Sequence, residues 1–459
     1  MNPRNVFIIP IFLLFFSIPL FYKLGASSLT SFDEAWYAAI SKNIINSGNL
    51  LNLKFNNQPF VDHPPAGFWL TAISQKIFGV DEFGSRAASA VIGLATLALI
   101  FRIGQKLSSP SVGLASAITL LSSPWFLSRA RSGNLDIFLT FFFLTSFYLA
   151  ILASENKKYL LPLSLSLILL FLTKTLVPFT ILPALVILFW NSPIIKTKSF
   201  LISSAVFLLS LTVWFISQLL YYPNYIFKYF TIGLPKIEKQ TSIWQNILLV
   251  KTYLHEGIGA FFKPAVLSLP LIIFLKNIPH SKQLIGALTF IVFFLAPFAL
   301  SSRSQIWHLI PVFPFLIIIS LTLLKSVLQI FFSSRLAATI IITLALIICL
   351  PQISRNWYSF IDIPAYISDE AILSRAASGY LQELYIDDRF LPAAVFYSGK
   401  TVNDLPTPDF SQYFSKSNDI LLITHRWRLE SLNPPPDRYR LLASDRDKVL
   451  LLIFSQSSN

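Results

Sequence analysis

Residues 135–153 read LDIFLTFFFLTSFYLAILA and contain one charged side chain, Asp136, near the start of the run. A helix of about 20 apolar residues crosses the roughly 30 Å of hydrocarbon in a bilayer. The stretch therefore predicts a transmembrane helix that begins with an acid. An acid at the mouth of such a helix is costly unless it is paired or reached by water, so Asp136 is also a candidate functional residue.

Apolar runs of this kind recur through the first 354 residues. We place spans at residues 6–23, 84–104, 110–128, 135–153, 159–173, 175–191, 200–221, 264–276, 284–300, 309–324 and 334–351. The composition agrees, because only 13% of the residues are charged, whereas soluble domains carry about 25%. The sequence predicts a polytopic α-helical membrane protein with about 11 transmembrane helices.

The end of the chain has a different character. Residues 355–459 hold 11 Lys or Arg and 13 Asp or Glu, against 25 and 9 in residues 1–354. Short apolar runs at 420–423 and 449–453 alternate there with a helix-like stretch at 368–381. We expect a membrane domain over residues 1–354 and a small C-terminal α/β domain over residues 355–459.

Basic residues predict the orientation in the membrane. Every second connection between spans carries a basic pair, as cytoplasmic loops do. The pairs are Arg102 and Lys106, Lys157 and Lys158, Lys196 and Lys198, Lys276 and Lys282, and Lys325 and Arg335. We expect a multi-pass protein of the plasma or inner membrane with a cytoplasmic amino terminus and an uncleaved first anchor. Eight of the nine acids of residues 1–354, and the C-terminal domain, then lie on the extracytoplasmic side.

Composition and motifs exclude several classes of function. A single Cys excludes a disulfide framework and a thiolate metal cluster. The sequence has neither of the two common glycine-rich nucleotide-binding motifs. In so apolar a chain, the net charge of +14 fits cytoplasmic loops and bound phosphate groups better than nucleic acid.

The first extracytoplasmic loop, residues 25–83, is too long for a simple connector. Ser31-Phe32-Asp33-Glu34 matches a capping box, and an apolar stripe follows at helical spacing over residues 36–44. We expect a helix in the membrane interface that ends at Gly48. Asp33 and Glu34 either cap this helix or supply a general base, and Glu34 can cap while Asp33 reacts.

Other extracytoplasmic residues are candidates for binding. In Asp62-His63-Pro64-Pro65 the prolines fix the backbone beside an acid and an imidazole, although a plain turn is the alternative. Arg129 and Arg131 precede Asp136 and either neutralise it or bind an anion. Lys174 contradicts the positive-inside tendency, which indicates a bound anion. Later outer loops contain His255 beside Glu256, and Arg303, Trp307 and His308.

Taken in order, these motifs resemble the GT-C glycosyltransferases, in the PMT-like branch (glycosyltransferase family 39) that contains protein O-mannosyltransferases and lipid A aminoarabinose transferases. The resemblance covers residues 1 to about 325. It is carried by Asp33-Glu34-Ala35-Trp36-Tyr37, Asp62-His63-Pro64-Pro65, Phe68-Trp69-Leu70, Phe78-Gly79-Val80, Arg86, Asn134-Leu135-Asp136, Lys174, His255 and Trp307-His308-Leu309-Ile310-Pro311.

The resemblance implies a GT-C fold and a set of site residues. Asp33 would be the catalytic base, with Glu34 beside it, and Asp136 a second essential acid. The donor phosphate would be bound among Lys174, Arg303, Arg129, Arg131, His63, Trp307 and His308. Asp62 and His255 would be candidate ligands of a divalent metal, the one cofactor considered. His63 replaces a Lys of the aminoarabinose branch and Trp36 replaces its Arg, so the sugar of that branch is not implied.

The expected function is inverting transfer of a sugar from a polyprenyl-phosphate donor to a hydroxyl acceptor at the extracytoplasmic membrane face. The acceptor can be a lipid, a glycan or a protein. A multispan transporter or lipid-linked sugar flippase is the alternative, although that class favours paired repeats and ionisable groups near the bilayer midplane. A non-catalytic scaffold or a degenerate transferase is the third reading.

Overall fold

The structure is a computed structural model that describes residues 14–234, 242–301, 305–404 and 407–455. The chain forms two compact units. We call residues 1–23, 61–67 and 87–363 the membrane unit, and residues 24–60, 68–86 and 364–459 the sheet unit. The division differs from the expected boundary after residue 354, because most of residues 25–83 group with the C-terminal residues.

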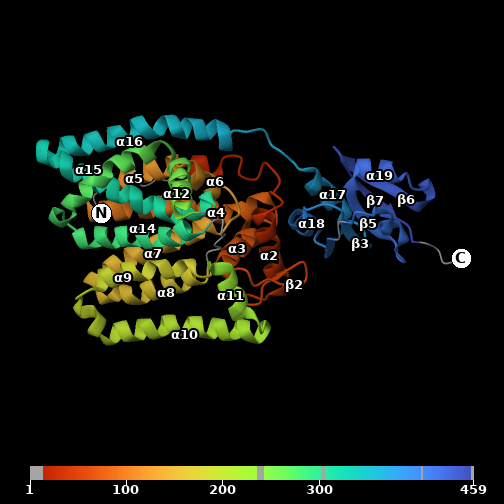
Figure 1. Cartoon of the computed structure of the whole chain (residues 1–459), viewed down its shortest axis with the longest axis horizontal. Helices are drawn as coiled ribbons and strands as arrows, with labels where there is room; N and C mark the ends of the chain where they lie inside the picture. Colours follow the sequence, from red (N-terminus) through yellow and green to blue (C-terminus); the bar gives the residue numbers. More distant parts are fainter. Residues whose placement is uncertain (1–13, 235–241, 302–304, 405–406, 456–459) are drawn as a thin grey trace. The chain divides into compact units, whose positions relative to one another are not determined.

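Apolar helices make up the membrane unit (Figure 1). They are α4 (Glu82–Leu107, shared with the sheet unit), α5 (Pro110–Ser122), α6 (Pro124–Ala130), α7 (Asp136–Glu155), α8 (Leu160–Phe171), α9 (Leu182–Phe189), α10 (Lys198–Tyr221), α11 (Tyr225–Gly233), α12 (Ile243–Ile258), α13 (Phe262–Ser268), α14 (Ser281–Leu300), α15 (Phe313–Phe331) and α16 (Ser334–Asn356). The 3-10 turns η2 (Val177–Ile181) and η6 (Ile306–Val312) lead into α9 and α15.

Seven of the described helical segments are long and apolar enough to cross a membrane, or eight if the bent pair α5–α6 is one span. The chain is therefore a multi-pass membrane protein. The bend of 76° between α5 and α6 lies at Pro124, where the Ser123 side chain caps the new helix. The apolar run expected over 175–191 is a shorter helix, Val177–Phe189. Residues 6–13 of the first expected span lie outside the described residues.

The span expected at 264–276 was predicted to begin too late in the sequence. The helical run there covers Ile243–Ile273. Lys251, His255 and Glu256 interrupt its apolar character, so a search for uncharged stretches finds only the second half. A helix tolerates such residues because its backbone hydrogen bonds are satisfied internally, whatever its side chains.

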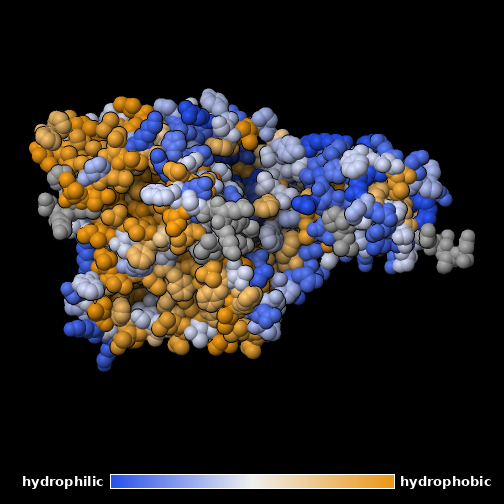
Figure 2. Space-filling model, in the orientation of Figure 1, coloured by the Kyte–Doolittle hydropathy of each residue, from blue (hydrophilic) through white to orange (hydrophobic). Residues whose placement is uncertain are grey.

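Exposure of apolar side chains distinguishes the outer helices from the inner ones. Within its most apolar stretch, α10 is only 11% buried, whereas the segment of α15 is 83% buried. Leu201, Leu209 and Leu220 of α10 are exposed. Figure 2 shows the apolar surface that results over the helices of this unit. Such a surface is stable in contact with lipid and not with water.

The sheet unit contains an α/β domain, as the sequence predicted. Its sheet has the order β4-β3-β5-β7-β6, in which β3, β4 and β5 are parallel and β7 is antiparallel to both neighbours. The elements are α2 (Asp33–Ser47), β1 (Lys54–Phe55), β2 (Gln58–Pro59), α3 (Ala66–Phe78), α17 (Asp369–Ala377), β3 (Glu383–Ile386), α18 (Leu391–Ser398), β4 (Val402–Asp404), β5 (Ile420–His425), α19 (Arg426–Leu432), β6 (Tyr439–Asp445) and β7 (Lys448–Ile453).

Alternating side chains of the strands build cores on both faces of the sheet. Leu421 and Ile423 pack with α17 and α18 on one face, and Leu422 packs with Phe410 and Tyr413 on the other. The buried apolar runs expected at 420–423 and 449–453 are β5 and β7. In this way the two hydrophobic runs identified in the sequence become the central strands.

Helix α2 forms a further layer on α18. Ala35, Ala38 and Ala39 share one buried cluster with Phe396 and Tyr397 of α18. Small side chains on α2 allow this close approach. The expected end at Gly48, which has a left-handed φ of 69°, is confirmed, and the helix begins at Asp33. The helix is buried on most of its faces, and its position in the membrane interface stays a prediction.

Candidate functional site

Asp136 is held at the first residue of α7. The side-chain oxygen of Asn134 accepts hydrogen bonds from the backbone N–H of Asp136 at 2.9 Å and of Ile137 at 3.4 Å. This turn satisfies amides at the helix start that otherwise lack partners. The Asp136 carboxylate is buried, near the positive end of the helix dipole. The Asn134-Leu135-Asp136 motif thus fixes an acid in one position.

The partner of Asp136 is Lys174. The Lys174 ammonium donates to a carboxylate oxygen of Asp136 at 2.6 Å, and the two side chains are 14% and 6% exposed. Lys174 lies in the short connection between α8 and η2. A buried ion pair contributes little net stability, because both ions lose their hydration. Its presence is therefore better explained by chemistry at the site than by folding.

His63 lies close to this pair. The backbone N–H of Ala66 donates to the Leu172 carbonyl at 2.8 Å, which ties the Asp62–Pro65 turn to the end of α8 beside Lys174. Burial, followed by the positive charge of Lys174, lowers the pKa of His63 to about 3. The imidazole is therefore neutral at physiological pH. His308, in η6, is close enough to His63 to contribute to the lowering of its pKa.

A cavity of about 570 Å³ opens beside these groups. His63, Lys174 and His308 line it at polar positions, while the rest of the wall is mainly apolar and includes Leu176, Phe294 and Phe298. A wall of this composition fits a molecule with a long apolar chain and an anionic head. All of the lining residues belong to the membrane unit.

Arg129 is a further basic residue of the membrane unit. Its guanidinium carbon lies 4.3 Å from the centre of the Trp307 ring and 5.8 Å from that of Trp125. Stacking on two indoles fixes the plane of the guanidinium. The Nε atom of Arg129 is buried and has no hydrogen-bond partner among the described residues. It is a donor suited to an incoming anion.

Arg131 has a different environment from Arg129. Its guanidinium donates to the carbonyls of Pro19 at 2.7 Å and Tyr22 at 2.8 Å, which anchors the end of the first helix. The sequence treated the two arginines alike, because they are only two residues apart on the chain. Arg303 lies outside the described residues.

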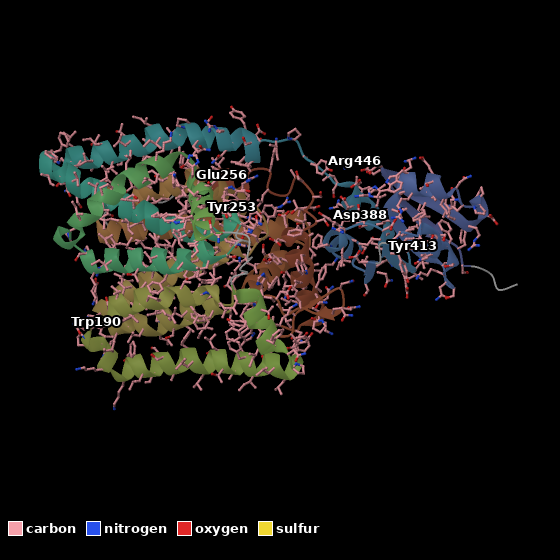
Figure 3. All side chains as sticks on the ribbon, viewed as in Figure 1. Trp190, Tyr253, Glu256, Asp388, Tyr413 and Arg446 are labelled. Carbon is pink, nitrogen blue, oxygen red and sulfur yellow. The ribbon has the colours of Figure 1, made fainter. Side chains whose placement is uncertain are left out.

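Asp62 and His255 were the candidate metal ligands. The Asp62 carboxylate lies 3.4 Å from the ammonium of Lys228 in α11. His255 is exposed on α12, close to Glu256 in sequence, with its ring 5.2 Å from that of Phe262; Figure 3 labels Glu256 on this helix. Among the described residues, no group of three or more His, Cys, Asp or Glu side chains could hold a metal ion.

In the sheet unit, Glu34 forms a buried ion pair with Arg86. The Arg86 Nε and Nη2 donate to the two carboxylate oxygens of Glu34 at 2.7 and 2.9 Å. The same guanidinium donates to the carbonyls of Leu24, Ser27 and Ser28. Arg86 thereby organises the chain that leads into α2, a role that the sequence did not reveal because its partners lie more than 50 residues away.

The expected capping box at Ser31 was wrong. Phe32 is the N-cap residue and makes no side-chain cap. The Glu34 carboxylate instead accepts from the backbone N–H of Thr30 at 2.9 Å, since Arg86 draws it back along the chain. Asp33, the first residue of the helix, is half-buried.

Two comparisons place this geometry among known proteins. Residues 62–217 match the family described as dolichyl-phosphate-mannose-protein mannosyltransferase. The fold matches the crystal structure of ArnT from Cupriavidus metallidurans in the apo state with a TM-score of 0.74 and 15% identity, covering 98% of each chain. The chain has the fold of ArnT, and it matches the mannosyltransferase family over about a third of its length. Its matched family region contains His63, Arg129, Asp136 and Lys174.

Curated proteins similar to this chain carry two kinds of name. Over 126 residues it is 37% identical to undecaprenyl phosphate-alpha-4-amino-4-deoxy-L-arabinose arabinosyl transferase of Pseudomonas savastanoi pv. phaseolicola, covering 27% of this chain and 23% of the relative. Over 140 residues it is 34% identical to polyprenol-phosphate-mannose--protein mannosyltransferase of Mycobacterium tuberculosis, covering 28% of this chain and 26% of the relative. The matches thus span about a quarter of each relative's length.

Proposed function

We propose that this protein is a membrane glycosyltransferase that moves a sugar from a polyprenyl-phosphate donor to a hydroxyl acceptor. The observation that carries the proposal is the 570 Å³ cavity, in which a largely apolar wall meets Lys174, His63 and His308. A polyprenyl phosphate has the matching chemistry, a long hydrocarbon chain ending in an anion. ArnT from C. metallidurans, a fold neighbour with a TM-score of 0.74 and 15% identity, has also been solved bound to undecaprenyl phosphate.

In the proposed reaction, Asp33 accepts the proton of the acceptor hydroxyl. The acceptor oxygen forms a bond to the anomeric carbon from the face opposite the phosphate, and the bond from that carbon to the phosphate oxygen breaks with its electron pair. The sugar is thus transferred with inversion. A general base contributes about 10² to 10⁴ in rate.

The charge that develops on the departing phosphate is the second requirement. Lys174 and Arg129 are the described cations that support its stabilisation, since buried donors act strongly in a medium of low polarity. Asp136 holds Lys174 in place. Arg303 and Arg131 remain candidates from the sequence, and the stacked Trp307 orients Arg129.

A divalent metal is not needed for these steps. Asp62 faces the Lys228 ammonium, and two candidate ligands are fewer than a metal site ordinarily has. Metal binding at Asp62 and His255 stays a prediction. We further propose that the protein acts at the extracytoplasmic face of the inner membrane, with its amino terminus in the cytoplasm, on the basis of the basic loops.

Transfer assays with purified protein in nanodiscs test the proposal. A panel of radiolabelled polyprenyl-phosphate sugars is offered with membrane extracts as acceptors. We expect transfer by the wild type from one donor, and a fall of about 10² to 10⁴ for Asp33→Asn. Glu155→Gln, which alters a surface pair with Lys106, is the matched control and should transfer normally.

A flippase would bind the same donors without transferring their sugar. Donor binding with no transfer by the wild type from any sugar would therefore overturn the proposal. Unchanged transfer by Asp33→Asn would remove Asp33 as the base and leave the activity itself intact.

A further inference from the structure

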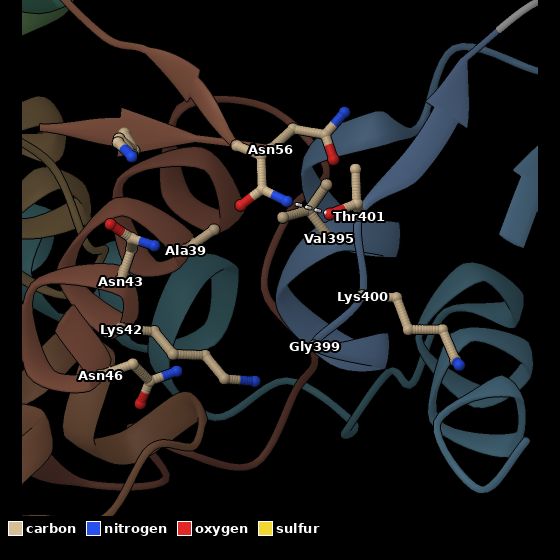
Figure 4. Close-up of a pocket in the computed structure, with 11 residues that line it drawn as sticks. Ala39, Lys42, Asn43, Asn46, Asn56, Val395, Gly399, Lys400 and Thr401 are labelled. Carbon is tan, nitrogen blue, oxygen red and sulfur yellow. Dashed lines mark hydrogen bonds between the residues drawn. The ribbon is translucent and has the colours of Figure 1, made fainter. Parts of the chain in front are cut away.

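Another cavity is lined only by residues of the sheet unit. It has a volume of about 90 Å³ and lies between the second half of α2, the β1–β2 hairpin and the turn from α18 to β4 (Figure 4). Three lysines and four asparagines line it, and none of the lining residues is acidic. Lys42, Asn43 and Asn46 come from α2.

The walls of this cavity are held by hydrogen bonds. Asn56 donates to the Val402 carbonyl and accepts from the Val402 N–H, both at 2.8 Å. Asn57 donates to the hydroxyl of Thr401. Both asparagines have positive φ, as a two-residue hairpin turn requires. The hairpin is thereby fixed to β4, and the cavity is preformed.

Two of the three lysines present their charge to the cavity. Lys42 is half-buried and donates to the Phe396 carbonyl at 3.0 Å, and Lys54 is exposed on β1. Neither has a carboxylate partner among the described residues. Lys400 differs because its side chain turns away from the cavity, and its ammonium donates to the carbonyls of Tyr380 and Gln382 (Figure 4).

Burial lowers the pKa of Lys42, so the fold holds this cation at a cost. Gly399 leaves room for it. A Cβ at Gly399 would lie 3.4 Å from the Lys42 ammonium, and the φ of 68° at this helix end disfavours other residues as well. A partly dehydrated ammonium that has no acid beside it gains free energy when an anion pairs with it.

We propose that this pocket binds a phosphate or carboxylate group carried by a sugar. The ammonium groups of Lys42 and Lys54, which have no carboxylate partner among the described residues, recognise the anion. The side-chain amides of Asn43 and Asn46 can exchange hydrogen bonds with neighbouring hydroxyls. The volume of about 90 Å³ suits one such group. The same chemistry is present in an acidic acceptor of the proposed transfer reaction and in an anionic lipid headgroup.

Direct binding tests the site without reference to transfer. Full-length protein in phosphatidylcholine nanodiscs is titrated with inorganic phosphate, D-glucuronate and D-glucose, and binding is followed by ligand-detected NMR. We expect the two anions to bind and glucose not to bind. Lys42→Met and Lys54→Gln should each weaken anion binding by about ten-fold, the range of a charged hydrogen bond.

Lys76→Gln is the matched control, because Lys76 is an exposed lysine of α3 that does not line the pocket. It should bind as the wild type does. Lys54 is exposed, so its replacement leaves folding intact even if Lys42→Met does not. Equal binding of glucose and glucuronate, or unchanged anion binding in Lys54→Gln, would overturn the proposal.

Two further experiments distinguish an acidic acceptor from an anionic lipid headgroup as the natural ligand. If the natural ligand is an acidic acceptor, Lys54→Gln raises the KM for that acceptor and leaves kcat and the donor KM unchanged, a result that also rests on the proposed function. If it is a lipid headgroup, phosphatidylglycerol in the nanodisc displaces glucuronate. Failure of transfer altogether would refute the proposed function and leave the NMR result standing.

Discussion

His63 is neutral in the fold, which predicts a pH dependence of stability. Its folded pKa of about 3 lies below the ordinary value of 6.5, so the unfolded chain binds a proton first as the pH falls. Stability is full above pH 6.5 and declines between 6.5 and 3, by about 2 kcal/mol at pH 5. We expect His63→Gln to lose less thermal stability than the wild type between pH 7.5 and 5. His280→Gln, a control in the turn before α14, should follow the wild type; equal slopes for all three proteins would contradict this account.

The Asp136–Lys174 pair predicts non-additive stability changes. Removing one partner leaves the other charge buried, which costs about 3–5 kcal/mol. The double variant Asp136→Asn, Lys174→Met leaves neither charge, so it should melt at a higher temperature than either single variant. A cycle of melting temperatures in one detergent measures this coupling. Additive losses would mean that the two charges act independently.

For single residues, the sequence identified candidate functional residues better than it identified their interaction partners. Asp136 and Lys174 were both identified because charges are rare in apolar surroundings. Their pairing was not, since neighbouring Arg129 and Arg131 were the nearer candidates along the chain. Packing brings together residues 38 positions apart, and local sequence contains no signal for that distance.

Among the elements, α2 carries two neighbouring acids to which we assign different roles: Asp33 as the proposed base and Glu34 as a residue that positions the helix. Arg86 connects Glu34 to three carbonyls, so Glu34 positions the start of α2, where Asp33 lies. We expect Glu34→Gln, which keeps one hydrogen-bonding oxygen, to retain far more transfer than Asp33→Asn. Arg86→Met should increase amide hydrogen exchange across residues 30–41 of the folded protein. Transfer by Glu34→Gln as low as that of Asp33→Asn would make Glu34 part of the chemistry.

Whole elements were predictable where a single physical rule determined them. The length of the apolar runs located α4, α7, α10 and α14. Short apolar runs separated by helix-like or polar stretches located β5 and β7. The rule failed at α12, whose charged residues do not prevent a helix. It also failed to show that α2 is buried, because the residues that cover it, such as Phe396 and Tyr397, come from the far end of the chain.

At the scale of the whole molecule, the sheet unit combines two distant parts of the sequence. Ala35, Ala38 and Ala39 of α2 share their core with Ala393, Phe396 and Tyr397, and Tyr397 donates to Glu82 at 2.9 Å and accepts from the N–H of Leu29 at 2.7 Å. A change of composition along the chain marked a boundary near residue 355. Composition indicates whether a segment is surrounded by water or by lipid, but it does not indicate which other segments it packs against. The C-terminal residues are therefore better described as packing into one unit with residues 24–60 and 68–86.

This shared core makes a prediction about truncation. A chain that ends at Ile363 should lose the packing of α2 and expose residues 24–60 to trypsin at Lys42 and Lys54. In the full chain, Phe396→Ala removes a buried ring and should cost about 3–5 kcal/mol, with faster cleavage at the same lysines. Leu381→Ala is the control, because Leu381 is 99% exposed and its loss should change nothing. If the truncated chain resists trypsin at residues 24–60 as well as the full chain does, the C-terminal residues form an independent domain, because their loss would then leave the core around α2 intact.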